Sequence, residues 1–263
     1  MSSFATSRDG TRIAYDIEGS GPPVILVAGA MQFRGFDPTT VAMAGLLAAR
    51  GFSVLNYDRR GRGESMEAPS FTLADTIDDL RALSAVAGGP VALYGNSSGG
   101  AIALAAAAAG LDVSALVLWE VPLREELGND GADFLDGLRA RIASGDADGT
   151  IAYFMKDMPP QWLEGARNGP GWPVMTSMGP SLEADSESLA WTQSAPRAEL
   201  WASIEAPTLA LVGEQTLPIM PPAAESIAAN VPHARKETLP AANHSWDPEV
   251  MAARIAEFLA RLP

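Results

Sequence analysis

VALYGNSSGG occupies residues 91–100, and an alanine-rich stretch follows it at residues 101–110. The apolar first residues predict a buried strand, and the alanines predict a helix. Between them, glycines at positions 95 and 99 allow a strand and a helix to approach each other closely around a tight turn. A strand, the pattern G-x-S-x-G and a helix in this order are the context of a nucleophile elbow, which exposes a reactive serine.

Two adjacent serines, Ser97 and Ser98, lie in this turn, and the glycine spacing favours Ser97 as the nucleophile. The backbone N–H of Ser98 is then expected to point where an oxyanion forms, at a helix N-terminus whose dipole favours negative charge. The alternative is a glycine-rich turn with an incidental serine. The strand–turn–helix context favours the nucleophile.

Short apolar runs elsewhere predict strands that are buried on both faces of a parallel sheet. They lie at residues 24–28, 53–57, 115–119 and 208–212, with a weaker one at 235–239. Helical patterns lie between them at residues 39–50, 72–86, 222–230 and 248–262. An alternating segment at 12–18 and a turn cluster at 19–23 predict an initial hairpin. Strands that alternate with helices indicate an α/β fold with right-handed crossovers and a doubly wound sheet.

The alternation stops between Pro122 and Trp201, where helical patterns are joined by turns rich in proline and glycine. We expect a helical cap at residues 122–201, inserted into a core that is formed by residues 1–121 and 202–263. Packing onto the core is enough to explain any one tryptophan or methionine of this segment. Together they suggest an apolar cavity, since ligand pockets are lined mainly by apolar and aromatic groups. Trp191 from the cap and Met31 from the core are candidates for contact with a substrate.

The composition is that of a folded protein able to bury a large core: 263 residues, 47% of them hydrophobic and 19% charged. The formal net charge of −14 argues against a nucleic acid as partner. The chain has no cysteine, which excludes disulfides, thiolate metal sites and a cysteine nucleophile. No signal-like or membrane-spanning apolar run is present, so we expect a cytoplasmic protein that makes no membrane contact. Neither a metal nor an organic cofactor is expected, and the sequence gives no indication of the oligomeric state.

A nucleophilic serine needs a base, and the chain has two histidines. His233 precedes a charged edge strand and is expected at the surface. His244 lies between the last predicted strand and the final helix, at the edge of the sheet where open α/β folds bind ligands. We therefore predict that His244 is the general base, with a structural loop histidine as the alternative.

The chain resembles the α/β-hydrolases along nearly its full length. The resemblance rests on Val27-Ala-Gly-Ala30, on Asp58-Arg-Arg-Gly-Arg-Gly-Glu-Ser65, and on the elbow and the late histidine, which follow in the family's order. It implies the α/β-hydrolase fold, a mostly parallel sheet flanked by helices with an inserted helical cap. The stretch 58–65 is a structural loop in that family, so no catalytic role is expected for Asp58 or Arg59.

The resemblance also implies where the second oxyanion donor lies. In this family it comes from the loop after the early strand, which here gives the backbone N–H of Ala30, with Met31 as the alternative. The usual His-Gly of this loop is replaced by Ala28-Gly29. Ala30 and Ser98 are therefore the two predicted donors of the oxyanion hole.

The acid departs from the family's common pattern. Most members carry it after the strand that is here at 209–213, where Thr216 now holds the expected position. Threonine cannot stabilise an imidazolium by charge. Glu120 closes the preceding strand, from where a carboxylate can reach a histidine, fix its tautomer and stabilise its charged form. An unpaired carboxylate at the end of a buried strand is costly, which also indicates a partner for Glu120.

Some hydrolases place their acid at this position, and a resemblance to the zearalenone-hydrolysing lactonases supports Glu120 in that role. These lactonases resemble this chain in length, in the G-x-S-S-G elbow, and in a glutamate that is followed closely by a proline. Glu214 and Asp247 are the competing acids, and a purely structural role for Glu120 is the remaining alternative.

The predicted function is that of a serine hydrolase that cleaves a carboxylic ester or lactone of an apolar small molecule through Ser97, His244 and Glu120. One alternative is another chemistry on the same scaffold, such as carbon–carbon bond hydrolysis or cofactor-free perhydrolysis. Another is a ligand-binding protein without activity, for which a broken triad would be the sign. Dehalogenases and epoxide hydrolases of this fold use an aspartate as nucleophile, and Ser97 argues against both.

Overall fold

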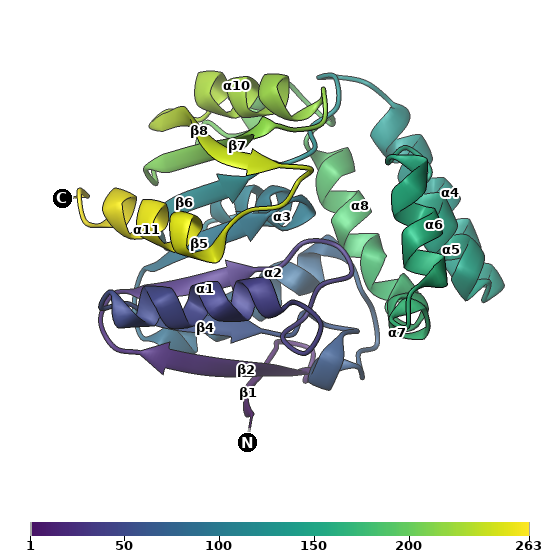
Figure 1. Cartoon of the computed structure of the whole chain (residues 1–263), viewed down its shortest axis with the longest axis horizontal. Helices are drawn as coiled ribbons and strands as arrows, with labels where there is room; N and C mark the ends of the chain where they lie inside the picture. Colours follow the sequence, from purple (N-terminus) through teal and green to yellow (C-terminus); the bar gives the residue numbers. More distant parts are fainter. Residues whose placement is uncertain (1, 263) are drawn as a thin grey trace.

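The computed structural model describes residues 2–262. Within this range eight strands form one sheet (Figure 1). They are β1 (Ser3–Thr6), β2 (Arg12–Gly19), β3 (Pro23–Val27), β4 (Ser53–Tyr57), β5 (Val91–Asn96), β6 (Val113–Trp119), β7 (Thr208–Gln215) and β8 (Ala234–Ala242). Their order in the sheet is β1-β2-β4-β3-β5-β6-β7-β8. All neighbours from β4 to β8 are parallel, which confirms the predicted mostly parallel sheet.

The antiparallel part of the sheet differs from the prediction. A hairpin does form, but it joins β1 to β2, and the far side of β2 pairs with β4. The turn at residues 19–23 therefore links two strands that have β4 between them. It passes against the end of that strand, where a Cβ on Gly21 would lie 2.1 Å from the Gly51 carbonyl oxygen. The turn signal was correct, and the hairpin predicted across it was wrong.

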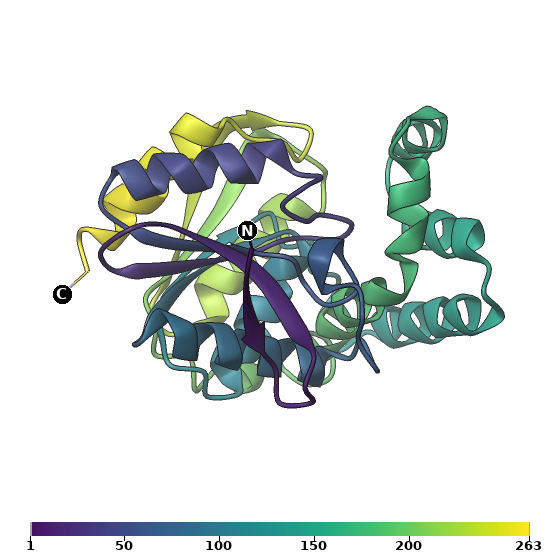
Figure 2. The ribbon, with the colours of Figure 1, turned by 90° about the horizontal axis from the view of Figure 1, so that it is seen from below.

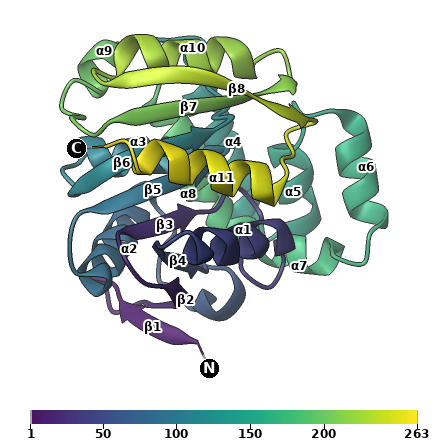
Figure 3. The ribbon, with the colours of Figure 1, turned by 60° about the vertical axis from the view of Figure 1, so that its left-hand side comes forward.

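Helices cover both faces of the sheet. α1 (Pro38–Ala49) and α11 (Pro248–Leu259) lie side by side on one face (Figure 3). The other face is covered by α2 (Leu73–Ala87), α3 (Ser98–Ala108) and α10 (Met220–Asn230). Successive strand residues point to opposite faces, so Ile25 packs with α2 and α3 while Leu26 packs with α1 and α11. This alternation explains why the strands read as continuously apolar.

The segment between β6 and β7 is helical, as predicted. Its helices are α4 (Asp130–Ser144), α5 (Ala147–Phe154), α6 (Pro160–Asn168), α7 (Trp172–Ser177), α8 (Leu182–Trp191) and the short α9 (Arg197–Leu200). Figure 2 shows α4–α7 standing beside the core rather than on it. α8 packs against α2 and α3 of the core and against α4, so it joins the two parts. We call α4–α8 the cap helices.

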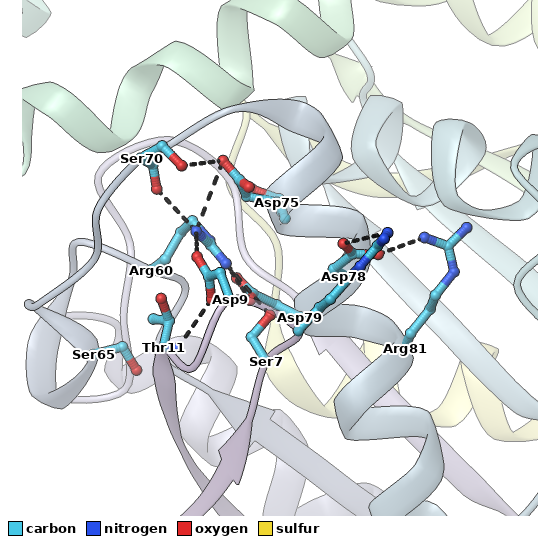
Figure 4. Close-up of polar contacts among 12 residues, drawn as sticks. Ser7, Asp9, Thr11, Arg60, Ser65, Ser70, Asp75, Asp78, Asp79 and Arg81 are labelled. Atoms are coloured by element: carbon cyan, nitrogen blue, oxygen red, sulfur yellow. Dashed lines mark hydrogen bonds and ion pairs between the residues drawn. The ribbon is translucent and has the colours of Figure 1, made fainter.

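The loop after β4 is fixed to the antiparallel edge and to α2 through Arg60 (Figure 4). The guanidinium of Arg60 is buried and binds Asp79 of α2 through two hydrogen bonds of 2.7 Å. It also donates to Asp9 over 3.1 Å. Farther along the loop, Ser65 Oγ accepts the Ala14 N–H at 2.8 Å. Two other arginines of this loop, Arg59 and Arg62, bind side chains of the insertion instead.

None of the helices within residues 2–262 combines the length and the apolar composition that a membrane span requires.

Candidate active site

Ser97 lies at the sharp turn between β5 and α3. Its backbone has φ 55° and ψ −126°, a conformation that is strained for a residue other than glycine. The glycines predicted to permit this turn do so by their lack of a side chain. A Cβ on Gly95 would lie 2.5 Å from Gly100 Cα, and one on Gly99 would lie 2.3 Å from the Val27 carbonyl oxygen. The local structure is thus that of a nucleophile elbow.

His244 lies in a turn directly after β8. The Asn243 N–H donates to the Gln215 carbonyl at 2.9 Å, and this bond holds the turn beside the end of β7. From there His244 Nδ1 lies 2.6 Å from Glu120 Oε2. A carboxylate accepts hydrogen bonds, so Nδ1 carries the proton and Nε2 is left as the basic nitrogen.

Glu120 directly follows β6, the strand next to β7, and its side chain is fully buried. Its second oxygen, Oε1, accepts the Gly213 N–H at 2.9 Å. Burial alone would raise the pKa of Glu120, but the hydrogen bonds from His244 and Gly213 hold the pKa below its ordinary value. The carboxylate is therefore ionised at neutral pH, and it can both orient the imidazole and stabilise its protonated form.

The competing acids lie elsewhere. Glu214 is exposed, and Asp247 caps α11 by accepting the N–H groups of Glu249 and Val250. Neither bonds to His244 within the described chain. His233 is exposed, as expected. Glu120 is thus the carboxylate that contacts the imidazole.

Ser97 and His244 line one cavity of about 410 Å³, at the carboxyl ends of the parallel strands. No hydrogen bond joins the two side chains in the described structure, and such contacts often tighten only when a substrate binds. The cavity wall is largely apolar. Its main apolar side chains are Met31, Phe134, Phe154, Met155, Met158, Trp162, Leu189 and Leu217.

The tryptophan prediction is corrected by the cavity lining. Met31 lines the cavity, whereas Trp191 does not appear in its wall among residues 2–262 and packs against the hydrophobic core. Trp162 of α6 takes the place expected for Trp191. Its ring lies nearly parallel to the His244 ring, with an interplanar angle of 26° and centroids 6.5 Å apart. Both tryptophans lie in helical segments of the insertion, and no sequence signal distinguished them.

The two predicted oxyanion donors, Ala30 and Ser98, also line the cavity. The loop that carries Ala30 passes directly against the nucleophile, since a Cβ on Gly29 would lie 3.2 Å from Ser97 Cβ. Gln32 links this loop to the elbow: its Oε1 accepts the Gly29 N–H at 2.8 Å and the Asn96 side-chain amide at 2.9 Å. The loop that carries Ala30 and the elbow that carries Ser97 and Ser98 are therefore joined by close packing and by the hydrogen bonds of Gln32.

No three histidine, aspartate or glutamate side chains among residues 2–262 are grouped so that they could hold a metal ion.

The model of the family described as "Alpha/beta hydrolase family" matches residues 24–258. The chain belongs to the α/β-hydrolase family.

Several solved structures have folds similar to that of this α/β-hydrolase. An alpha/beta hydrolase from Sphaerobacter thermophilus is 33% identical, with a TM-score of 0.83 over 97% of this chain and 99% of that one. A thermophilic esterase from Thermogutta terrifontis is 23% identical, with a TM-score of 0.70 over 99% and 97% of the two chains. An enol-lactonase from Burkholderia xenovorans is 20% identical, with a TM-score of 0.67 over 98% and 100%. The last two likenesses show the fold alone. No curated protein matches the sequence significantly.

Proposed function

We propose that this α/β-hydrolase is a serine hydrolase that cleaves carboxylic esters or lactones of apolar small molecules. The observation that supports it most is the 2.6 Å contact between His244 Nδ1 and the buried Glu120, in the same cavity as Ser97. An imidazole that is oriented by an ionised carboxylate, beside a serine on a strained elbow, is the arrangement of a serine nucleophile with its base.

The mechanism proceeds by two acyl transfers. Ser97 Oγ attacks the carbonyl carbon of the substrate while His244 Nε2 takes the hydroxyl proton, and Glu120 stabilises the imidazolium. The resulting oxyanion accepts hydrogen bonds from the N–H groups of Ala30 and Ser98. Collapse of the intermediate breaks the bond to the alcohol oxygen, which leaves with the proton from His244. Water, activated by His244, then hydrolyses the acyl-enzyme by the same steps.

The cavity supports an apolar substrate. Its volume of about 410 Å³ falls within the range of roughly 300–1,000 Å³ that small-molecule pockets occupy. Its wall contains methionine, phenylalanine and tryptophan side chains, which suit an apolar substrate. In a lactone the alcohol stays attached to the acyl group, so ring-opening needs no separate exit for a leaving group. The proposed resemblance to zearalenone-hydrolysing lactonases covers two features: the ring-opening of a lactone, and an acid that is a glutamate after β6.

The test combines labelling with turnover. A fluorophosphonate probe and peptide mapping should give a single adduct on Ser97, which is lost in His244→Ala. A pH-stat panel of apolar esters and lactones should show acid release by the wild type and none by Ser97→Ala. A folded wild-type protein that neither reacts with the probe nor releases acid from any member of the panel would refute the proposal.

A further inference from the structure

Three charged side chains form a buried cluster between the core and the cap, here called the cap–core cluster: Arg59, Arg62 and Asp185. The two arginines come from the loop after β4, and Asp185 comes from α8. Arg59 Nη1 lies 2.7 Å from Asp185 Oδ1, and Arg62 Nη2 lies 2.6 Å from Asp185 Oδ2. All three side chains are at most 2% exposed.

On one side the cluster holds the loop that carries Ala30. Arg62 Nη1 donates to the Gly29 carbonyl at 2.5 Å, and Arg59 Nη1 donates to the Ala28 carbonyl at 3.2 Å. The Gly29 carbonyl and the Ala30 N–H belong to the same planar peptide group, so a bond that fixes the carbonyl also fixes the direction of the N–H. A guanidinium on the carbonyl oxygen further polarises that peptide and strengthens its N–H as a donor.

On the other side the cluster holds the elbow. Ser98 Oγ donates to Asp185 Oδ1 at 2.6 Å. The residue whose backbone N–H is the other predicted oxyanion donor is thus bound through its own side chain to the carboxylate that holds both arginines. One carboxylate on a cap helix is connected to both donors of the hole. This contact also explains why the elbow has a second serine: the Ser98 hydroxyl links the elbow to α8.

A stabilising role alone is a weak explanation for these buried charges. Removing ionic groups from water is costly, and apolar side chains of similar volume often stabilise a fold at least as well. Arg59 Nε is buried without a hydrogen-bond partner among the described residues. Burial and the nearby Arg59 lower the pKa of Arg62 to about 10, which still leaves it charged at neutral pH. Two guanidiniums against one carboxylate leave a surplus positive charge beside the loop that carries Ala30.

We propose that Asp185, Arg59 and Arg62 are positioning residues for the oxyanion hole, and that the hole is complete only while α8 is docked on the core. The inference rests on the proposed function, because it assigns a task within that reaction. The cap then takes part in catalysis through α8, in addition to lining the cavity.

The decisive variant is Ser98→Ala, because it leaves both Arg–Asp pairs in place and removes only the bond to the elbow. We expect kcat to fall about tenfold with KM within twofold, since loss of a whole oxyanion donor costs roughly 10²–10³ in kcat. Ser98→Thr keeps a hydroxyl and should recover most of the loss. Asp185→Asn, which removes the charge that joins both donors, should lower kcat by about 100-fold. The affinity for a boronic acid that forms a tetrahedral adduct on Ser97 should fall by the same factor as kcat/KM.

Asp79→Asn is the matched control. It breaks the buried ion pair of Arg60, the neighbour of Arg59 in the same loop, and neither Arg60 nor Asp79 lines the cavity. This variant should lose thermal stability and keep kcat. If Ser98→Ala and Asp185→Asn behave in the same way, losing stability at unchanged kcat, the cluster is structural and the inference is overturned.

A readout that does not depend on activity separates the inference from the proposed function. In the ¹H–¹⁵N spectrum the Ala30 amide should shift in Asp185→Asn, which weakens the hold of both arginines, and stay in place in Asp79→Asn. A wild type without turnover or labelling refutes the proposed function, and the Ala30 amide still decides whether the cluster positions that N–H. An Ala30 amide that is unmoved in Asp185→Asn overturns the inference.

Discussion

Glu120 and His244 are 124 residues apart in the chain, and their side chains meet at 2.6 Å between Oε2 and Nδ1. The sheet order explains the contact. β6, which Glu120 follows, lies next to β7, and β7 lies next to β8, which His244 follows. The Gly213 N–H at the end of β7 binds the other oxygen of Glu120, so the carboxylate is held between the two strand ends. The carboxylate can therefore follow β6 while the imidazole follows β8.

The first prediction concerns this carboxylate. Glu120→Gln keeps the shape of the side chain but removes its charge and no longer enforces the tautomer with the proton on Nδ1. We expect kcat to fall on the order of 10⁴-fold, the scale known for such a change in a triad. Initial rates on an ester that the wild type hydrolyses provide the measurement. Glu214→Gln is the control and should stay within twofold, and reversed effects would assign the acid to Glu214.

The second prediction is a dependence of stability on pH. The folded-state pKa of Glu120 lies below its ordinary value of 4.5, so its stabilising effect is fully present above that pH. The effect is lost as the pH falls through the lowered folded-state pKa. Thermal melts from pH 7 down to pH 3 should show the stability difference between the wild type and Glu120→Gln shrinking below pH 4.5. A difference that is constant over this range would speak against an ionised Glu120.

The third prediction tests the packing of the elbow. Gly99→Ala would place a Cβ 2.3 Å from the Val27 carbonyl oxygen, so strand and helix must move apart. Overpacking of this kind costs about 1–3 kcal/mol, and displacement of Ser97 should lower kcat as well. Urea unfolding and rates on the same samples measure both effects. Gly89→Ala, whose added Cβ meets nothing within 4 Å, should be close to neutral in both measurements.

The fourth prediction concerns Trp162, whose ring lies over His244 and forms part of the cavity wall. Trp162→Ala removes apolar surface that an apolar substrate would cover. We expect KM to rise about tenfold for the larger apolar substrates and to change little for small ones, in keeping with 1–2 kcal/mol of lost burial. Trp172→Ala is the control, because Trp172 bonds to Asp148 at the surface and does not appear in the wall of the cavity. Equal effects of both variants would show that the change acts through the stability of the cap.

The sequence predicted those parts of the fold and site that depend on local chemistry. The pattern around Ser97 requires a strand, a tight turn and a helix in that order, and the structure contains all three. Glu120 stands directly after an apolar run, and His244 follows the weaker last strand, so their place at the carboxyl edge of a parallel sheet follows from the order of the predicted strands. The helical insertion was indicated by the loss of that pattern.

Other features depend on which segments meet in space. β4 lies between β2 and β3, a pairing that no local turn signal reveals. The contact between Arg59 and Asp185 joins residues 126 positions apart. In a helix as polar as α8, Asp185 looks like any other solvent-facing acid. Its burial follows from the packing of α8 between the core and α4.

The anchoring of α8 through Asp185 divides the insertion into two parts for protein engineering. Within the insertion, the side chains that accept hydrogen bonds from Arg59 and Arg62 of the loop after β4 are Asp185 of α8 and Ser181 just before that helix. By contrast, α4–α7 contribute most of an apolar cluster, shared with Leu182 of α8, and part of the cavity wall. A chimera that exchanges residues 130–177 for the matching segment of a homologue is therefore expected to change substrate range and keep the rate of acyl transfer. A junction placed after Asp185 is expected to yield a folded hybrid with a misaligned catalytic centre.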